Sequence, residues 1–140
     1  MAVLILGEKP QAAKRIAEAL AEDKVLVRHP KGLVTFYELN RDGKTIFVSS
    51  AVGHLFNLVE RDKGGWDYPV FDVEWKASHL MLKESRFTKK YVDTLVALSK
   101  KCDTLYVATD KDVEGELIGY NVRRFLFSDV RNVFRMEFST

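Results

Sequence analysis

The chain has 140 residues, 46% of them hydrophobic and 30% charged, with a formal net charge of +2. This composition is typical of one globular domain with a single core, and the net charge is too small to indicate nucleic-acid binding by itself. No apolar stretch approaches the roughly 20 residues of a membrane-spanning helix and no signal-peptide pattern occurs, so we expect no membrane association and a cytoplasmic location.

An apolar run from Ala2 to Leu6 predicts a first buried strand. Gly7-Glu8-Lys9-Pro10 closes this run, and Pro10 suits the first turn of a helix. The helix itself is predicted by apolar residues at helical spacing, which are Ala13, Ile16, Ala17 and Leu20. In open α/β sheets, sites form beyond the carboxyl ends of the strands, and Glu8 follows such an end.

The next part of the chain predicts an antiparallel hairpin beside a parallel core. Strands are expected over residues 25–28, 34–39 and 45–49, with Arg41-Asp42-Gly43 as the turn between the last two. A loop is expected over residues 62–68, which include Gly64-Gly65.

A helix is expected over residues 87–101, followed by another strand. The helical spacing places Tyr91, Leu95, Leu98 and Cys102 on one stripe. Because Cys102 is the only cysteine, an internal disulfide and a cysteine zinc site are excluded. The β-branched and aromatic run 104–108 predicts a buried strand.

The most informative stretch, residues 108–116, is Ala-Thr-Asp-Lys-Asp-Val-Glu-Gly-Glu, with four carboxylates within seven residues. Apolar residues recur at helical spacing after it, namely Leu117, Ile118, Val122, Phe125 and Leu126. The acids therefore lie on a turn between a strand and a helix. A last strand is expected over residues 132–138.

If the extended geometry continues past the strand, Asp110 and Asp112 point in the same direction. Two carboxylates about 5 Å apart repel by roughly 3 kcal/mol at an effective dielectric near 20, and a divalent cation removes that penalty. Ligands that are all oxygen select a hard ion such as Mg²⁺. Because Glu8 also follows a strand, it can meet Asp110 in space although the two are far apart in the chain.

The alternative from the residues alone is that acids such as Asp112 and Glu114 only stabilise the positive end of the following helix. Glu116 is already one turn into that helix, so we expect it to face solvent.

Four stretches, in order along the chain, match the motifs of one family. They are residues 7–17, similar to EKP-x-x-A-x-x-I-A; residues 50–55, similar to S-x-x-G-H-L; residues 68–75, Tyr-Pro-Val-Phe-Asp-Val-Glu-Trp; and residues 109–116, similar to T-D-x-D-x-E-G-E. Together they resemble the type IA DNA topoisomerases, and residues 68–75 are similar to the archaeal branch. The resemblance implies that residues 1–140 are a single TOPRIM domain, a Rossmann-like α/β fold. Its mainly parallel sheet is flanked by helices and extended by the antiparallel hairpin.

Two departures from the family pattern limit what the resemblance implies. Val113 stands where many relatives have Arg, so any phosphate contact made by that Arg is absent. Residues 135–140 resemble the start of the family's R-x-x-F-S/N segment, and the later C-terminal domains are expected to be missing. The family's nucleophilic tyrosine lies in a later motif similar to Y-x-R-T/S-D. No tyrosine here has that context, so no nucleophile is expected among Tyr37, Tyr68, Tyr91, Tyr106 and Tyr120.

The activity implied by the resemblance is a transesterification on single-stranded DNA that relaxes supercoils in the full-length enzyme. Glu8 is implied as general acid and base, and Lys9 as the residue that holds the scissile phosphate. Mg²⁺, or Mn²⁺ in its place, is implied on Asp110, Asp112 and Glu114, with Glu8 as a further ligand. The candidate DNA-binding residues are Lys9, Lys14, Arg15 and His54. For the last three of these, the alternative is a solvent-facing or structural role.

Two other functions fit the same residues. The first is a different TOPRIM enzyme, a primase-like nucleotidyl transferase or a nuclease, which would show metal-dependent activity with this chain alone. The second is a non-catalytic module that docks onto DNA or a protein, with the acids only capping a helix. Failure to bind Mg²⁺ or Mn²⁺ would favour the second.

Overall fold

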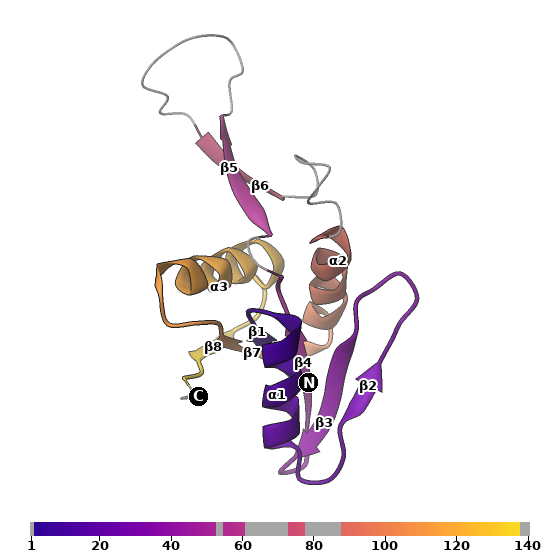
Figure 1. Cartoon of the computed structure of the whole chain (residues 1–140). Helices are drawn as coiled ribbons and strands as arrows, with labels where there is room; N and C mark the ends of the chain where they lie inside the picture. Colours follow the sequence, from indigo (N-terminus) through magenta and orange to yellow (C-terminus); the bar gives the residue numbers. More distant parts are fainter. Residues whose placement is uncertain (1, 53–54, 61–72, 78–87, 138–140) are drawn as a thin grey trace.

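A computed structural model describes residues 2–52, 55–60, 73–77 and 88–137 (Figure 1). Its strands are β1 (Ala2–Gly7), β2 (Leu26–Arg28), β3 (Phe36–Arg41), β4 (Lys44–Ser50), β5 (Phe56–Glu60), β6 (Val73–Ala77), β7 (Cys102–Ala108) and β8 (Asn132–Arg135). Its helices are α1 (Pro10–Leu20), α2 (Thr88–Ser99) and α3 (Val113–Leu126). Within these ranges, no helix combines the length and apolar character needed to cross a bilayer.

Six of the strands form one sheet in the order β2-β3-β4-β1-β7-β8. β1 pairs in parallel with both β4 and β7, and β7 pairs in parallel with β8. β3 pairs antiparallel with β2 and β4. This arrangement confirms the predicted α/β fold, a parallel core with an antiparallel hairpin added at one side.

The hairpin between β3 and β4 turns at Asp42 and Gly43, whose φ angles are 52° and 77°. Positive φ at both central residues is the geometry of a tight hairpin turn whose twist matches the strands that it joins. Asp and Gly are among the residues that tolerate this backbone region, so the predicted turn at residues 41–43 is confirmed.

Helices cover both faces of the sheet, with α1 on one face and α2 and α3 on the other (Figure 1). β1 is therefore buried along its whole length, as its unbroken apolar sequence requires. Successive residues of β1 pack on opposite faces. Leu6 belongs to the cluster that includes Leu95 of α2, whereas Ile5 belongs to the cluster that includes Ala17 of α1.

Three predictions about the elements are corrected. The strand pair β5 and β6, which projects away from the main sheet in Figure 1, was not expected from the sequence. Cys102 begins β7 and does not lie on the stripe of α2, because α2 ends at Ser99. Its burial raises the pKa of the thiol to about 11. The last strand ends at Arg135, short of the expected residue 138.

Some predictions concern residues outside the described ranges. These are the loop at 62–68, most of the motif at 68–75, and the site residue His54. They remain predictions.

Candidate functional site

Glu8 and Asp110 lie beside each other at the carboxyl ends of β1 and β7. The register that pairs Gly7 with Ala108 brings the two strand ends to the same edge of the sheet. Across this edge, the backbone N–H of Asp110 donates a hydrogen bond to Oε1 of Glu8, with 3.3 Å between the atoms. Two residues separated by 102 positions are thus joined, as expected for strands whose ends form a site.

The surroundings of Glu8 favour its neutral form. Partial burial is the main cause that raises the pKa of Glu8 above its usual value. The hydrogen bond from the backbone of Asp110 acts in the opposite direction, while the negative charges of Asp110 and Asp112 raise the pKa further. A carboxyl group with a raised pKa can hold a proton nearer to neutral pH than an exposed glutamate, which suits proton transfer.

Asp112 caps the N-terminus of α3. Its backbone is extended, and its Oδ1 accepts a hydrogen bond of 2.7 Å from the N–H of Gly115. Its carbonyl oxygen accepts a hydrogen bond of 2.9 Å from the N–H of Glu116. Asp112 therefore does have the alternative role predicted for it, that of an acid that stabilises the start of a helix. One of its two carboxylate oxygens is used for this hydrogen bond.

The acidic turn, residues 109–116, runs from the end of β7 into the first turn of α3, and Gly115 allows its two ends to pack directly against each other. A Cβ placed on Gly115 would overlap the carbonyl oxygen of Asp110 and would lie 2.8 Å from its carbonyl carbon and 2.9 Å from its nitrogen. Only a residue without a side chain fits there. The close packing holds the backbone of Asp110 against the first turn of α3.

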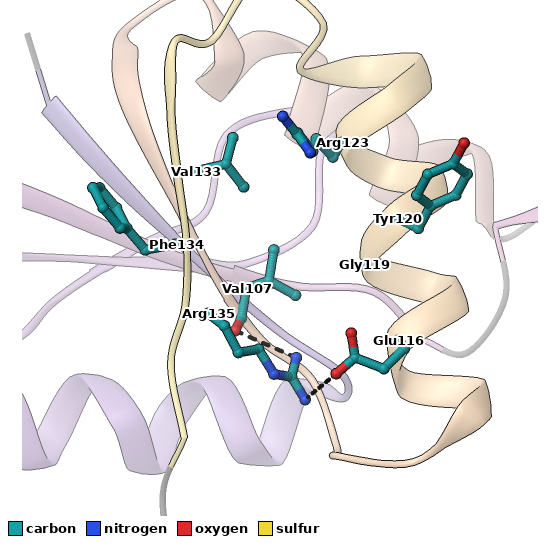
Figure 2. A pocket seen from close by; sticks show the side chains of 8 residues that line it. All are labelled: Val107, Glu116, Gly119, Tyr120, Arg123, Val133, Phe134 and Arg135. Carbon is teal, nitrogen blue, oxygen red and sulfur yellow. Dashed lines mark hydrogen bonds and ion pairs between the residues drawn. The ribbon is translucent and has the colours of Figure 1, made fainter.

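Arg135 of β8 joins both ends of the acidic turn, which the sequence did not reveal. Figure 2 shows its contact with Glu116. Its Nη1 donates to Thr109 Oγ1 at 2.9 Å, and its Nη2 forms an ion pair with Glu116 Oε1 at 3.1 Å. Thr109 Oγ1 in turn donates to the carbonyl oxygen of Gly115 at 2.7 Å. The side chain of Glu116 is 60% exposed, so it faces solvent as expected but is also paired.

The guanidinium lies in a groove of about 210 Å³ between α3 and β8. Tyr120 and Arg123 of α3 line the same groove further along the helix (Figure 2). A signal for Arg135 existed in the sequence, because it opens the motif at residues 135–140, but its contacts depend on how β8 packs beside β7.

The predicted metal ligands do not form a closed cage. Among the described residues, no three His, Cys, Asp or Glu side chains are grouped so that they could hold a metal ion. Glu8, Asp110 and Asp112 nevertheless offer only oxygen atoms at one edge of the sheet, and Glu8 and Asp110 are in contact. Glu114 adds an exposed carboxylate in the first turn of α3. This donor set fits a hard cation that keeps part of its water and shares its remaining ligands with a substrate phosphate.

The predicted basic residues lie near the same edge. Lys9 is exposed at the N-cap position of α1, directly after Glu8, and its side chain makes no capping hydrogen bond. Lys14 and Arg15 lie on the exposed side of α1, opposite its buried residues Ala13, Ile16 and Ala17. All three cations are therefore accessible, and a role in binding DNA remains a prediction for them.

The comparisons with known proteins agree with this arrangement. The Toprim domain family matches residues 3–140. The chain is 45% identical to DNA topoisomerase 1 of Methanocaldococcus jannaschii over its whole length, which is 18% of that protein. It is 42% identical to DNA topoisomerase 1 of Pyrococcus furiosus over 98% of its length, which is 13% of that protein. Reverse gyrase 1 of Aquifex aeolicus is 28% identical over 97% of the chain and 11% of that protein.

The chain thus spans less than a fifth of the length of these relatives. The match to the family covers β1, the acidic turn and α3, the elements that bring Glu8 and Asp110 together. The chain belongs to the Toprim domain family, in a form similar to that of archaeal DNA topoisomerase 1.

Proposed function

We propose that this chain is the metal-binding part of a type IA topoisomerase active site. In this role it takes part in the cleavage and religation of single-stranded DNA, and so in the relaxation of supercoils, together with C-terminal topoisomerase domains that include the nucleophilic tyrosine. The main supporting observation is the contact between Glu8 and the backbone of Asp110 at the adjacent ends of β1 and β7. The similarity to two archaeal proteins named DNA topoisomerase 1 supports the same proposal.

Glu8 is the proposed acid in the chemical step. The hydroxyl of a tyrosine from another domain loses its proton to solvent as its oxygen attacks a backbone phosphorus, and the bond from phosphorus to the 3′ oxygen breaks. In religation the tyrosine oxygen leaves the phosphorus and regains a proton from solvent. Glu8 gives its proton to the departing 3′ oxygen, and takes it back when the 3′ hydroxyl attacks the phosphotyrosine during religation. The raised pKa of Glu8 favours the protonated form that the first step needs.

The neighbouring groups handle the negative charge of the phosphate. Lys9, exposed beside Glu8, is the proposed contact for the scissile phosphate, and Lys14 and Arg15 extend the positive surface along α1. Asp110, Asp112 and Glu114, with Glu8, are the proposed ligands of Mg²⁺, which Mn²⁺ can replace. When bound, this ion supplies positive charge that aligns the DNA ends for religation. Because the proposed substrate is DNA, the compartment that we expect is the cytoplasm.

A titration calorimetry experiment with Mn²⁺ and Mg²⁺ tests the metal site. We expect weak binding by the unchanged chain, since such sites borrow ligands from phosphates, and no measurable binding by the double variant Asp110→Asn/Asp112→Asn. Asn at position 112 can still cap α3 through its side-chain oxygen, so the fold should survive.

The matched control is Asp23→Asn/Asp129→Asn, which removes the same charge at two exposed positions elsewhere on the molecule. Equal binding by the unchanged chain and by the Asp110/Asp112 double variant would refute the assignment of the ligands. The cap formed by Asp112 favours one alternative, a docking module whose acids only stabilise a helix. That module should bind neither ion.

A further inference from the structure

Arg135 holds both ends of the acidic turn with one side chain. Thr109, at the start of the turn, accepts from Nη1, and Glu116, at its end, pairs with Nη2. The three proposed metal ligands of this turn, Asp110, Asp112 and Glu114, all lie between these two contacts in the sequence. The conformation of the six residues in between is therefore constrained from both sides by a single guanidinium.

The guanidinium is itself held in place by β8. Arg135 pairs with Val107 in the parallel ladder between β7 and β8, and the N–H of Met136 donates to the carbonyl oxygen of Val107 at 2.9 Å. Arg135 Nη1 also lies 3.4 Å from that carbonyl oxygen, and the side chain is 24% exposed. The planar fork of an arginine can reach several acceptors at once, which a lysine cannot.

Thr109 extends this connection into α3. Its side chain is buried, and its hydroxyl accepts from Arg135 while donating to the carbonyl oxygen of Gly115. A continuous chain of hydrogen bonds thus runs from β8 through Thr109 to the first turn of α3. Gly115 is also the residue whose N–H is capped by Asp112, so the chain ends at a proposed metal ligand.

We infer that Arg135 is a positioning residue that holds Asp110, Asp112 and Glu114 in the arrangement that accepts a divalent cation. This inference rests on the proposed function, because it assigns Arg135 a part in the same metal site. Arg135 does not contact the cation. It acts through Thr109 and Glu116.

A second contact, an ion pair, also joins the acidic turn to the end of the chain segment that contains β8, but it is weaker. Lys111 Nζ and Glu137 Oε1 are 3.2 Å apart, with side chains 74% and 60% exposed. Exposed ion pairs of this kind contribute little, so we expect Glu137→Gln to leave cation binding unchanged.

The direction in which Arg135→Met changes the Mn²⁺ affinity distinguishes a positioning role of Arg135 from a purely electrostatic one. Removal of a positive charge near a cation site should strengthen cation binding if charge alone matters. Loss of positioning should weaken it, and we expect Mn²⁺ to bind about five- to tenfold more weakly to Arg135→Met, in line with the loss of one or two hydrogen bonds. Arg135→Lys keeps the positive charge but not the fork, so charge alone predicts the Mn²⁺ affinity of the unchanged chain, whereas loss of positioning predicts weaker binding.

The control is Arg123→Met. It removes one positive charge from the same groove, at a position two helical turns beyond Glu116 in α3. Its guanidinium takes part in none of the contacts described for Arg135. Its Mn²⁺ affinity should equal that of the unchanged chain or exceed it slightly. Circular dichroism and thermal unfolding of each variant establish that it is folded.

A measurement without metal tests the same inference independently. In Arg135→Met the amide protons of Gly115 and Glu116, which are bonded to Asp112, should exchange with solvent about fivefold faster, while those of β1 should not change. Faster exchange together with weaker Mn²⁺ binding supports the inference. Unchanged exchange, or Mn²⁺ binding that is equal or tighter in Arg135→Met, overturns it. If the unchanged chain binds no Mn²⁺, the proposed function fails, and the positioning role fails with it.

Discussion

Glu8 has a different acid–base equilibrium in the folded chain from that of an exposed glutamate. Burial raises its pKa, so the ionised form costs free energy in the folded state that it does not cost in the unfolded state. Below the usual pKa of glutamate, Glu8 is protonated in both states and this cost disappears. The contribution of Glu8 to stability is therefore greatest at low pH, and it is lost as the pH rises through the raised pKa of the folded state.

We predict that Glu8→Gln increases the free energy of unfolding near pH 7 and has no such effect near pH 3.5, below the usual pKa of glutamate. Glutamine is neutral at both pH values, and its side-chain oxygen can still accept the hydrogen bond from Asp110. Urea denaturation of both proteins at the two pH values measures the difference. Glu18→Gln, at an exposed position of α1, is the control and should change little at either pH. A Glu8→Gln variant that is less stable than the unchanged chain at neutral pH would contradict this account.

The helix α3 begins where it does because Gly115 permits close contact with the preceding turn. Any side chain at position 115 would collide with the backbone of Asp110, which cannot rotate away as a side chain can. Gly119, one turn later, meets a different neighbour, since a Cβ there would lie 2.5 Å from the Cγ1 methyl of Val107. The two glycines thus allow the same helix to pack closely, Gly115 against the backbone of Asp110 beyond the end of β7 and Gly119 against the side chain of Val107 in β7.

Gly115→Ala should destabilise the chain by about 2 kcal/mol or more, because the backbone of the acidic turn has to shift. Gly119→Ala should cost less, since the methyl of Val107 belongs to a side chain that can adjust. Chemical denaturation gives the free energy for each variant, and calorimetry with Mn²⁺ shows whether the shifted turn still binds a cation. Equal stability of Gly115→Ala and the unchanged chain would mean that the turn is more adaptable than its packing indicates.

The elements that the sequence predicts well are those whose pattern is local. The apolar run of β1, the acidic turn and the apolar stripe of α3 each determine a position in the fold without reference to distant residues. The pair of β5 and β6 could not be predicted in this way, because the residues between them, 61–72, are too many for the two-residue turn that identifies the hairpin of β3 and β4. Cys102 was misplaced because its spacing continues the stripe of α2, while the chain has already left the helix at Ser99.

The site shows the same limit at the level of single contacts. The meeting of Glu8 and Asp110 follows from a general rule about strand ends, so it was predictable. A helix cap and a metal ligand can both be an aspartate at position 112. The spacing of the residues therefore cannot distinguish these two roles of Asp112. The role of Arg135 depends on β8 lying beside β7, which is a tertiary feature with no local sign in the sequence.

For the whole molecule, we predict that the chain alone neither cleaves single-stranded DNA nor forms a covalent adduct with it. None of its tyrosines has the motif of the family's nucleophile, and Tyr120, for example, lies on the exposed side of α3. End-labelled single-stranded DNA is incubated with the chain and Mg²⁺ and analysed by denaturing electrophoresis. DNA without protein, and protein with chelator, are the controls. A metal-dependent cut that is lost in Glu8→Gln would instead support a Toprim nuclease.

The central place of β1 in the sheet has a consequence for how the chain is made. β1 leaves the ribosome before the other strands of this sheet, but one of its two neighbours, β7, is separated from it by most of the chain. At about 5–20 residues per second, the 102 positions from Glu8 to Asp110 take roughly 5–20 s to synthesise. During that time the edge of β1 that will pair with β7 stays unpaired, so it can pair with other strands or bind chaperones. Glu8 thus acquires its surroundings only after Asp110 has been synthesised, and a nascent chain that stalls before Asp110 has no site at all.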